Sequence, residues 1–398
     1  MQGNWLVTVL EDHNSQTNNN DTYRKKLPRS NFIGAIHIRL SATINNAGND
    51  ADFVTDFLEV VQRIRVKGNG FADILDLTGK ELRNIMTPTI GAQPGYNLTH
   101  KEAEYISYDF PILFGRYEHD TEYILPAKLF KTLNLEIQYN LTPITDPGFD
   151  TQTFTIDVTV EEYISDDNPF SKKIIKRTEV ESDTTKSGNI NVELPLGGIY
   201  KQIMIQQEDD NVDVGTSIGE VQLRINNGSE IPYTVRFVEL MSMNMKEMGL
   251  PPAILTGVTT KANDDTIITN LGRIKSAQID YEDGSQGTNI LERVTIDGWA
   301  GGQLTLKCDA TAALTEATDA NRTVSAYTTI APVRYTAESF DAVPECAFLV
   351  FDKNGDMSLC PDSSAFNDAT VRLAGADTNA TYSVCLEEIV IIPQPKAV

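Results

Sequence analysis

The sequence predicts an all-β protein that contains two copies of one antiparallel sandwich. Three observations support this fold class: apolar and polar residues alternate along many short segments, two halves of the chain resemble each other in the same order, and helical periodicity is confined to two short segments. The chain has 398 residues, of which 40% are hydrophobic. This length allows two or three domains, each with its own core.

Alternation with a period of two begins near residue 36, where Ile36, Ile38 and Leu40 alternate with His37 and Arg39. A strand with one buried and one solvated face gives this pattern. It recurs in residues 133–139, 154–160, 221–225, 304–308 and 382–386. Clean alternation favours antiparallel sheets, because parallel sheets covered on both faces give continuous apolar runs.

Helical spacing is limited to two segments, one with Leu82, Ile85 and Met86 after Gly79, and one with Met241, Met245 and Met248. Each predicts a short helix. We interpret the methionine stripe as a helix docked on its own sandwich; the alternative is an adaptable binding surface.

Three pairs of segments match between the halves in the same order. Residues 63–69 match 222–228, residues 126–137 match 361–373, and residues 154–158 match 382–386. The offset rises between the first and second pair, which places roughly 76 extra residues in the second copy. The chain is therefore predicted to be a duplication.

The matches divide the chain. We expect an N-terminal arm over 1–30, a first unit over 31–164, a linker over 165–190, and a second unit over 191–393. The extra residues form a surface insertion at about 246–345. About eight short antiparallel strands per unit suit a jelly roll, so the fold predicted is two tandem eight-stranded jelly rolls with short helices and a long loop insertion in the second.

Charge and composition exclude several classes of protein. The chain has 33 Lys and Arg against 56 Asp and Glu, a net charge of −23. We expect no sequence-specific nucleic-acid partner, because phosphate binding needs a basic surface. The N-terminus lacks the basic region and apolar run of a signal peptide, and no apolar stretch is long enough to span a membrane.

The cysteines lie at spacings that give no C-x-x-C pair and no nearby histidines. We expect buried thiols instead of a zinc site or disulfides. They are Cys308, Cys346, Cys360 and Cys385.

Two tandem jelly rolls with one long insertion resemble the double jelly-roll major capsid proteins of tailless icosahedral viruses. This family includes the adenovirus hexon and the coat proteins of tectiviruses and corticoviruses. The resemblance covers about 360 residues, from Asn31 to Pro393. The segments that carry it are residues 110–116, 124–127 and 133–139 in the first roll, and 193–200, 201–206 and 221–227 in the second.

The resemblance implies a homotrimer whose six rolls form a pseudo-hexagonal tile of the capsid. It implies that the insertion is a tower facing outward and that the opposite end faces the genome or an internal membrane. The resemblance to phage coat proteins implies a bacteriophage protein that is synthesised in the host cytoplasm and resides in the virion. Its partners would be further copies of itself and a vertex protein.

Two basic clusters precede the two rolls of this acidic chain, and we expect both at the inner end. They are Arg24, Lys25, Lys26 and Arg29, and Lys172, Lys173, Lys176 and Arg177. One interpretation is contact with anionic lipid headgroups. The alternative is ion pairing with neighbouring subunits or plain solvation.

Asp352, Asn354 and Asp356 have the spacing of the first ligands of a calcium loop. However, Met357 replaces the usual glycine and Ser363 replaces the bidentate glutamate. We favour a type I′ turn between strands at 348–351 and 357–359, and calcium binding is the alternative.

The sequence predicts no catalytic, cofactor or metal site. His13, His37, His100 and His119 are scattered, and no known catalytic motif is present. The alternatives to a capsid subunit are a vertex or receptor-binding virion protein and a tandem β-sandwich carbohydrate-binding or carbohydrate-active protein. Only Trp5 and Trp299 are available to line a sugar cleft.

Overall fold

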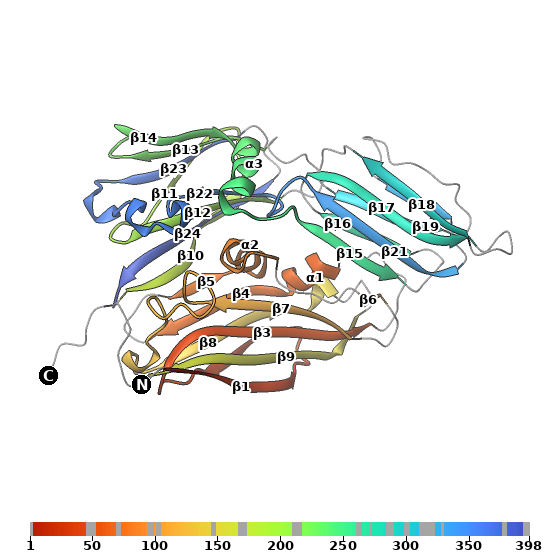
Figure 1. Cartoon of the computed structure of the whole chain (residues 1–398), viewed down its shortest axis with the longest axis horizontal. Coiled ribbons are helices and arrows are strands. Elements are labelled where there is room, and N and C mark those ends of the chain that lie inside the picture. The colour runs from red at the N-terminus through yellow and green to blue at the C-terminus, as the bar shows by residue number, and fades with distance from the viewer. Residues whose placement is uncertain are drawn as a thin grey trace.

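Two β-sandwiches lie one above the other, and a third lobe of strands lies beside them (Figure 1). The computed structural model describes residues 3–44, 53–68, 73–93, 99–100, 105–144, 149–165, 173–208, 217–259, 265–270, 273–283, 290–297, 303–309, 323–327, 330–375 and 380–392. The predicted all-β class is confirmed.

The first sandwich has two four-stranded layers with the orders β1-β9-β3-β7 and β2-β8-β4-β5. Its strands are β1 (Asn4–Ser15), β2 (Asn20–Lys26), β3 (Phe32–Ile44), β4 (Val61–Gly68), β5 (Leu75–Leu77), β7 (Tyr105–Leu113), β8 (Leu133–Asn140) and β9 (Phe149–Ile164).

The second sandwich repeats this arrangement with the orders β10-β24-β12-β22 and β11-β23-β13-β14. Its strands are β10 (Lys173–Thr184), β11 (Gly188–Glu193), β12 (Ile199–Glu208), β13 (Ile218–Ile225), β14 (Glu230–Arg236), β22 (Cys346–Val350), β23 (Ala369–Gly375) and β24 (Thr381–Ile391). The segments matched in the sequence fall on equivalent strands: β4 with β13, β8 with β23, and β9 with β24. The two tandem jelly rolls are therefore confirmed.

One sheet continues from the first roll into the second. β5 pairs in parallel with β10, with Leu75 opposite Arg177 and Asp76 opposite Thr178. The result is an eight-stranded sheet with the order β2-β8-β4-β5-β10-β24-β12-β22. We call the β5–β10 junction and the residues around it the seam.

The third lobe is formed mainly by residues 254–339, inside the expected insertion. A five-stranded sheet has the order β18-β17-β21-β15-β6, and a three-stranded sheet has the order β16-β19-β20. The strands are β6 (Thr99–His100), β15 (Ile254–Thr259), β16 (Asp265–Asn270), β17 (Ile274–Asp283), β18 (Ile290–Asp297), β19 (Gln303–Asp309), β20 (Thr323–Tyr327) and β21 (Ile330–Ser339). The insertion is thus a layered β structure, to which the first roll contributes β6.

Both predicted helices are present, as α2 (Gly79–Ile90) and α3 (Phe237–Met248), and α1 (Phe53–Val60) precedes β4. Thr78 and Glu81 form a reciprocal capping box at the start of α2. Gly91 ends this helix with φ of 81°, a left-handed conformation that glycine adopts without strain. Single turns of 3-10 helix are η1 (Ala127–Leu129), η2 (Thr142–Ile144), η4 (Lys353–Gly355), η5 (Met357–Leu359) and η6 (Ser363–Ala365).

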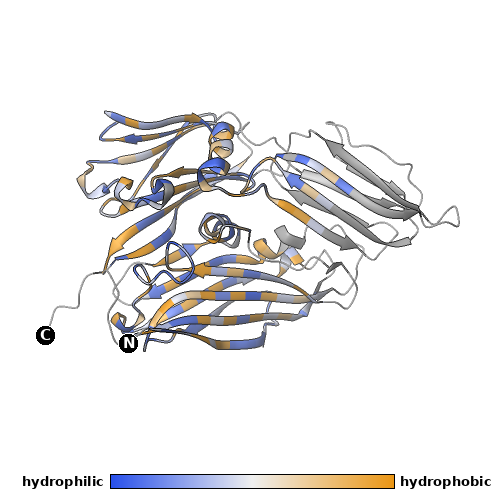
Figure 2. Cartoon of the chain, in the orientation of Figure 1, coloured by the Kyte–Doolittle hydropathy of each residue, from blue (hydrophilic) through white to orange (hydrophobic). Residues whose placement is uncertain are grey.

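Hydropathy alternates along the strands of both rolls (Figure 2). The inward residues form the core, and one continuous apolar cluster joins Leu82 of α2 to Met204, Phe348 and Val350 of the second roll. The methionines of α3 are packed as well: Met241 is buried in the core cluster of the second roll, and Met245 packs against the cluster that crosses the seam. The interpretation of the stripe as a docked helix is therefore correct.

The expected N-terminal arm is wrong. Residues within 1–30 form β1 and β2, which pair with β9 and β8 inside the first roll. The linker expected over 165–190 is wrong for the same reason, since it contains β10 and the start of β11. Residues 166–172, and the expected end of the second unit at 393, lie outside the described residues.

Among the described residues, no helix is both long and apolar enough to cross a membrane.

Candidate functional site

The seam contains a buried network of charges. Arg177 on β10 is 1% exposed, and its guanidinium lies 2.7 Å from the Glu387 carboxylate on β24. Arg177 also donates to the Leu113 carbonyl oxygen at 2.6 Å, so a side chain of the second roll binds the backbone of the first. The seam is therefore held by polar as well as apolar contacts.

Lys201 extends this network, with its ammonium 3.2 Å from Glu387 and 3.5 Å from Asp352. Burial raises the pKa of the Glu387 carboxyl, but the charges of Arg177 and Lys201 outweigh burial and hold the pKa below its ordinary value. Glu387 therefore stays ionised between two cations.

The Asp352 segment does not form the expected hairpin. Residues 353–355 and 357–359 are 3-10 turns. Asp352 pairs with Lys201, and Asp356 accepts the backbone N–H of Ser358 at 2.9 Å. The Asn354 side chain lies outside the described residues. Calcium binding therefore has no support from the two described carboxylates, which are engaged elsewhere.

The first basic cluster is in part neutralised. Arg24 lies 3.4 Å from Glu136, and Lys25 lies 2.6 Å from Glu11. Arg29 donates to the carbonyl oxygens of Phe130 and Lys131 and so ties the loop after β2 to the loop before β8. Lys26 is exposed at the end of β2.

The sequence analysis missed three cations on β4 that extend this cluster. Arg63, Arg65 and Lys67 lie at every second position of β4, so they share one face beside Arg24. Arg63 and Arg65 both contact Asp76, while Lys67 and Arg24 both contact Glu136. Arg63 also contacts Glu179, so the four cations share three carboxylates. The signal was the R-x-R-x-K spacing within an alternating strand.

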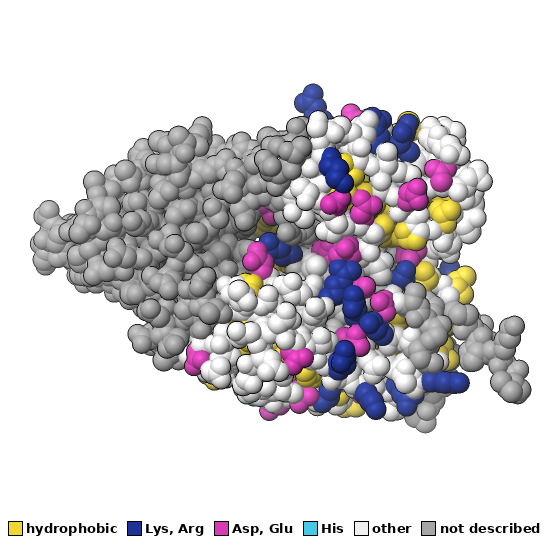
Figure 3. All heavy atoms as spheres, turned by 180° about the vertical axis from the view of Figure 1, so that it is seen from behind, with side chains coloured by type: hydrophobic (Ala, Val, Ile, Leu, Met, Phe, Trp, Pro, Cys, Tyr) yellow, Lys and Arg dark blue, Asp and Glu magenta, His cyan; other side chains and the backbone are white. Residues whose placement is uncertain are grey.

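Lys and Arg side chains gather over the first roll on one face of the molecule, with Asp and Glu among them (Figure 3). This face is a local exception to the acidic composition of the chain.

The second basic cluster is divided by the structure. Arg177 is buried in the seam, and Lys176 lies 3.0 Å from Glu388. Lys172 lies outside the described residues, and Lys173 begins β10 with a partly exposed side chain. The expectation of an exposed cluster is wrong for Arg177, because strand alternation turns it into the seam.

Two edge strands of the repeat have different surroundings. β10, the first strand of the second roll, is covered by β5. Its counterpart β1 pairs only with β9 among the described strands, and it exposes Val7 and Val9 by 63% and 62%. β14, the counterpart of β5, pairs only with β13 among the described strands. Among the described strands, β5 and β10 therefore pair with each other at the seam. The equivalent strands β14 and β1 each have one edge without a partner strand.

Three histidines lie close to carboxylates on one face of the first roll, although they are scattered in the sequence. His37 Nε2 lies 3.2 Å from Glu161, and His119 Nε2 lies 3.8 Å from the same carboxylate. His13 lies between Asp12 and Asp157. The hydrogen bond to Asp12, followed by the charges of Asp157 and Asp12, raises the pKa of His13.

The described cysteines are buried thiols that form no disulfide with one another, as expected: Cys346, Cys360 and Cys385. Burial raises the pKa of the Cys360 thiol to about 11, so this thiol is a poor nucleophile at neutral pH. The side chain of Cys308 lies outside the described residues.

The fold matches that of solved viral capsid structures. The crystal structure of the STIV MCP superposes with a TM-score of 0.57 and 14% sequence identity, covering 98% of each chain. The atomic structure of Sulfolobus Turreted Icosahedral Virus gives a TM-score of 0.55 and 15% identity, covering 99% of this chain and 91% of that chain. The PBCV-1 virus capsid gives 0.54 and 8%, covering 98% and 94%.

No protein-family model matches the sequence, and no curated protein matches it. The chain has the double jelly-roll fold of these major capsid proteins over almost its whole length. At such low identities, the likeness concerns the fold.

Proposed function

We propose that the chain is a major capsid protein that self-assembles as trimers and forms the icosahedral shell of a virus. The observation that carries this proposal is the pair of open edges, β1 and β14, equivalent to the two strands that close the seam. The fold shared with capsid proteins supports the same role. The function is structural, and the chain acts in the virion.

The repeat defines what would cover β1. Val7 pairs with Glu161 on β9, and Arg177 pairs with Glu387 on β24. Glu161 and Glu387 take the same place in the repeat, because each lies at a register shift in the pairing of its strand with β3 or with β12. Val7 therefore corresponds to Arg177. Arg177 is buried because the first roll lies against it, whereas Val7 is 63% exposed. A second copy of the chain, presenting β14, is the natural cover.

Such a contact joins different surfaces of two copies. Contacts of this kind form a closed ring when the rotations between successive rolls add up to a full turn. Three copies with two rolls each give the six-roll ring of a pseudo-hexagonal tile. Pro232 lacks an N–H, so we expect strand pairing to use the part of β14 from Tyr233 to Arg236.

The test is the mass of the protein in solution. The wild type should be a particle of three 44.0 kDa chains. The double variant Val7→Glu and Val9→Glu should be a monomer, because each copy would place two carboxylates in an apolar contact. The matched control is Leu359→Glu, which changes a residue of similar exposure, 58%, on neither edge strand.

A monomeric wild type at micromolar concentration would refute the proposal, and so would a double variant that remains trimeric. A folded monomer that hydrolyses glycans would support the carbohydrate-active alternative instead.

We further propose that the shell encloses a membrane and that the end of the rolls opposite the third lobe faces it. The described chain begins and ends there, with the start of β1 and the end of β24 (Figure 1). Lys26 ends β2, Arg29 lies in the next loop, and Lys173 begins β10, so cations from both rolls gather there. Each adds about 1 kcal/mol of attraction to anionic lipid near a surface.

Flotation of trimers with vesicles of phosphatidylglycerol and phosphatidylcholine tests this role. Replacing Lys26, Arg29 and Lys173 by Glu should weaken binding by roughly 100-fold. The control is Lys186→Glu, which changes an exposed lysine beyond the far end of β10. Equal binding by wild type and triple variant would overturn the lipid role and leave the capsid role intact.

A further inference from the structure

A bulge in β1 gathers three metal-ligand groups at one point on the surface of the first roll. The pairing with β9 passes from Glu11 opposite Val158 to Asn14 opposite Ile156. Two residues, Asp12 and His13, therefore stand opposite Asp157 alone. Bulges redirect side chains, since neighbouring residues of a regular strand point to opposite faces.

The backbone of the bulge has the conformation that this convergence requires. His13 has φ of 49°, in the left-handed region that side chains rarely adopt. Its backbone N–H donates to the Asp157 carboxylate, which fixes the bulge against β9. The three side chains therefore come together from two adjacent strands.

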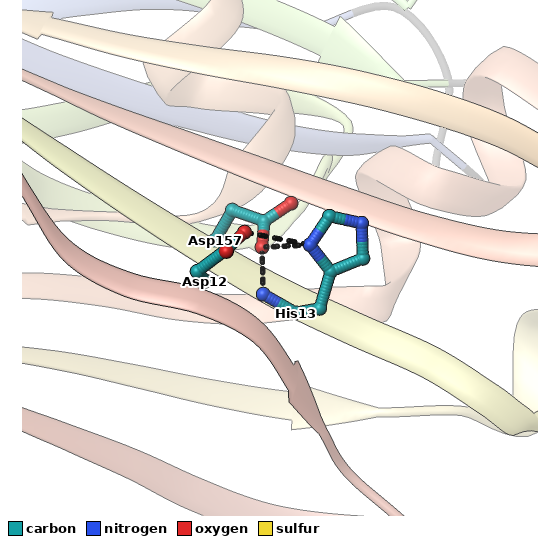
Figure 4. Close-up of side chains that lie close together, drawn as sticks. All are labelled: Asp12, His13 and Asp157. Atoms are coloured by element: carbon teal, nitrogen blue, oxygen red, sulfur yellow. Dashed lines mark hydrogen bonds and ion pairs between the residues drawn. The ribbon is translucent and has the colours of Figure 1, made fainter.

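The distances suit a small divalent cation. His13 Nδ1 lies 2.7 Å from Asp12 Oδ1 and 3.7 Å from Asp157 Oδ1 (Figure 4). One ligand atom from each of the three residues lies within 4.8 Å of the others. In a tetrahedral zinc site, bonds of about 2.0–2.1 Å separate ligand atoms by about 3.3 Å. The separations of 2.7 and 3.7 Å lie on either side of that value.

The donor types define the class of ion. An imidazole nitrogen with two carboxylates suits zinc and similar transition ions better than magnesium or calcium, which prefer oxygen alone. Two carboxylates would also neutralise the charge of a divalent ion. Arg39, which lies opposite Asp157 on the neighbouring strand β3, is engaged by Asp109 at 2.8 Å.

The site would be open on its outer side. The side chains of His13 and Asp12 are 73% and 79% exposed, and that of Asp157 is 20% exposed. A fourth ligand, from water or another molecule, can therefore approach, as it does at zinc sites with three protein ligands.

We propose that Asp12, His13 and Asp157 form a binding site for a zinc-type divalent cation. The site is independent of the capsid role, because its three ligands belong to one chain.

A second group on the same face, Glu118, His119 and Glu161, is the matched comparison. There, the Glu161 carboxylate is already shared with His37 at 3.2 Å. The His119 ring also packs against Trp5 at a tilt of 58°, with a centroid separation of 4.6 Å. These contacts engage two of the three donor side chains with other residues, so the bulge site should bind zinc more tightly.

The test is a zinc titration of the full chain, measured by calorimetry. A parallel titration with Co²⁺ in place of zinc is measured by visible absorption. We expect one tight equivalent per chain. His13→Ala and Asp157→Asn should each weaken it at least tenfold, and His119→Ala should leave it unchanged.

His13→Cys guards against a variant that binds poorly because it is misfolded. It should keep the ion and give the Co²⁺ spectrum a sulfur-to-metal band. Binding weaker than millimolar in the wild type would overturn the proposal. Tight binding that survives His13→Ala would also overturn it. If this binding were instead lost in His119→Ala, the ion would belong to the second group.

Discussion

Arg177 shows how much depends on one side chain at the seam. Its charge is buried between Glu387 and the Leu113 backbone, so removing it leaves a carboxylate with Lys201 as its remaining cation. Breaking a buried pair on one side costs more than removing both partners, because a lone buried charge has lost its hydration.

We therefore expect Arg177→Met to lower the free energy of unfolding by about 3 kcal/mol. The double variant Arg177→Met with Glu387→Leu should lose less, since Lys201 keeps Asp352 as a partner. Unfolding in denaturant at fixed protein concentration measures both. A single variant as stable as the wild type would show that the network contributes little.

The burial of Arg177 could not be read from its neighbours in the chain. The segment from Lys172 to Arg177 resembles a solvated basic run, and only the pairing of β10 with β5 determines which of its residues face the seam. Likewise, the meeting of Asp12 and His13 with Asp157 depends on a contact between residues more than 140 positions apart. Sequence spacing carries no signal for such a contact.

At the scale of elements, α2 carries a titratable group at its cap. Glu81 accepts the Thr78 backbone N–H at 2.8 Å and is 2% exposed. Burial, followed by the charge of Glu179, raises the pKa of Glu81 to about 7, above its ordinary value of 4.5. The folded state therefore holds this proton more tightly than the unfolded state.

The sign of the pH effect follows from this shift. The contribution of the proton to stability is complete below about pH 4.5 and is lost as the pH rises through about 7. Glu81→Gln keeps an oxygen for the Thr78 N–H and has no charge to bury. At pH 8, we expect it to be more stable than the wild type by on the order of 2 kcal/mol.

Thermal unfolding at pH 4 and pH 8 gives the comparison. The gain in stability from Glu81→Gln should disappear at pH 4, where the buried Glu81 of the wild type and the Gln of the variant are both neutral. Glu193→Gln, on the exposed face of β11, is the control and should show no such dependence. A gain of the same size at both pH values would contradict the role given to burial.

The elements differ in how well the sequence predicts them. The strands β3, β8 and β9 have one buried and one solvated face, so their alternation is clear, and the capped helix α2 begins directly after Thr78. β1 is harder to recognise, because Val7 and Val9 are exposed and the bulge at Asp12 and His13 interrupts its period. An edge strand that lacks its cover looks like a polar arm in sequence.

At the scale of the molecule, the core of the first roll extends into the second, which also has a core cluster of its own. The cluster that holds Leu82 of the first roll also holds Met204 and Phe348 of the second. Asn84 on α2 crosses the same boundary and donates to Gln206 at 3.1 Å. Packing and hydrogen bonds thus continue through the seam.

We expect the two rolls to unfold together in a single calorimetric transition. Asn84→Ala should lower the temperature of that transition without dividing it, because it removes a bond and not the shared cluster. Two resolved transitions, or one that splits in the variant, would show that the rolls are independent.

The continuous sheet has a consequence for how the shell would grow. In a ring of three copies, three of the six roll junctions are made inside a chain, where one roll meets the next at the effective concentration set by a short tether. Only the other three depend on how many copies are present. Duplication thus halves the number of junctions that form between separate chains, and it sets the angle between neighbouring rolls before any two copies meet.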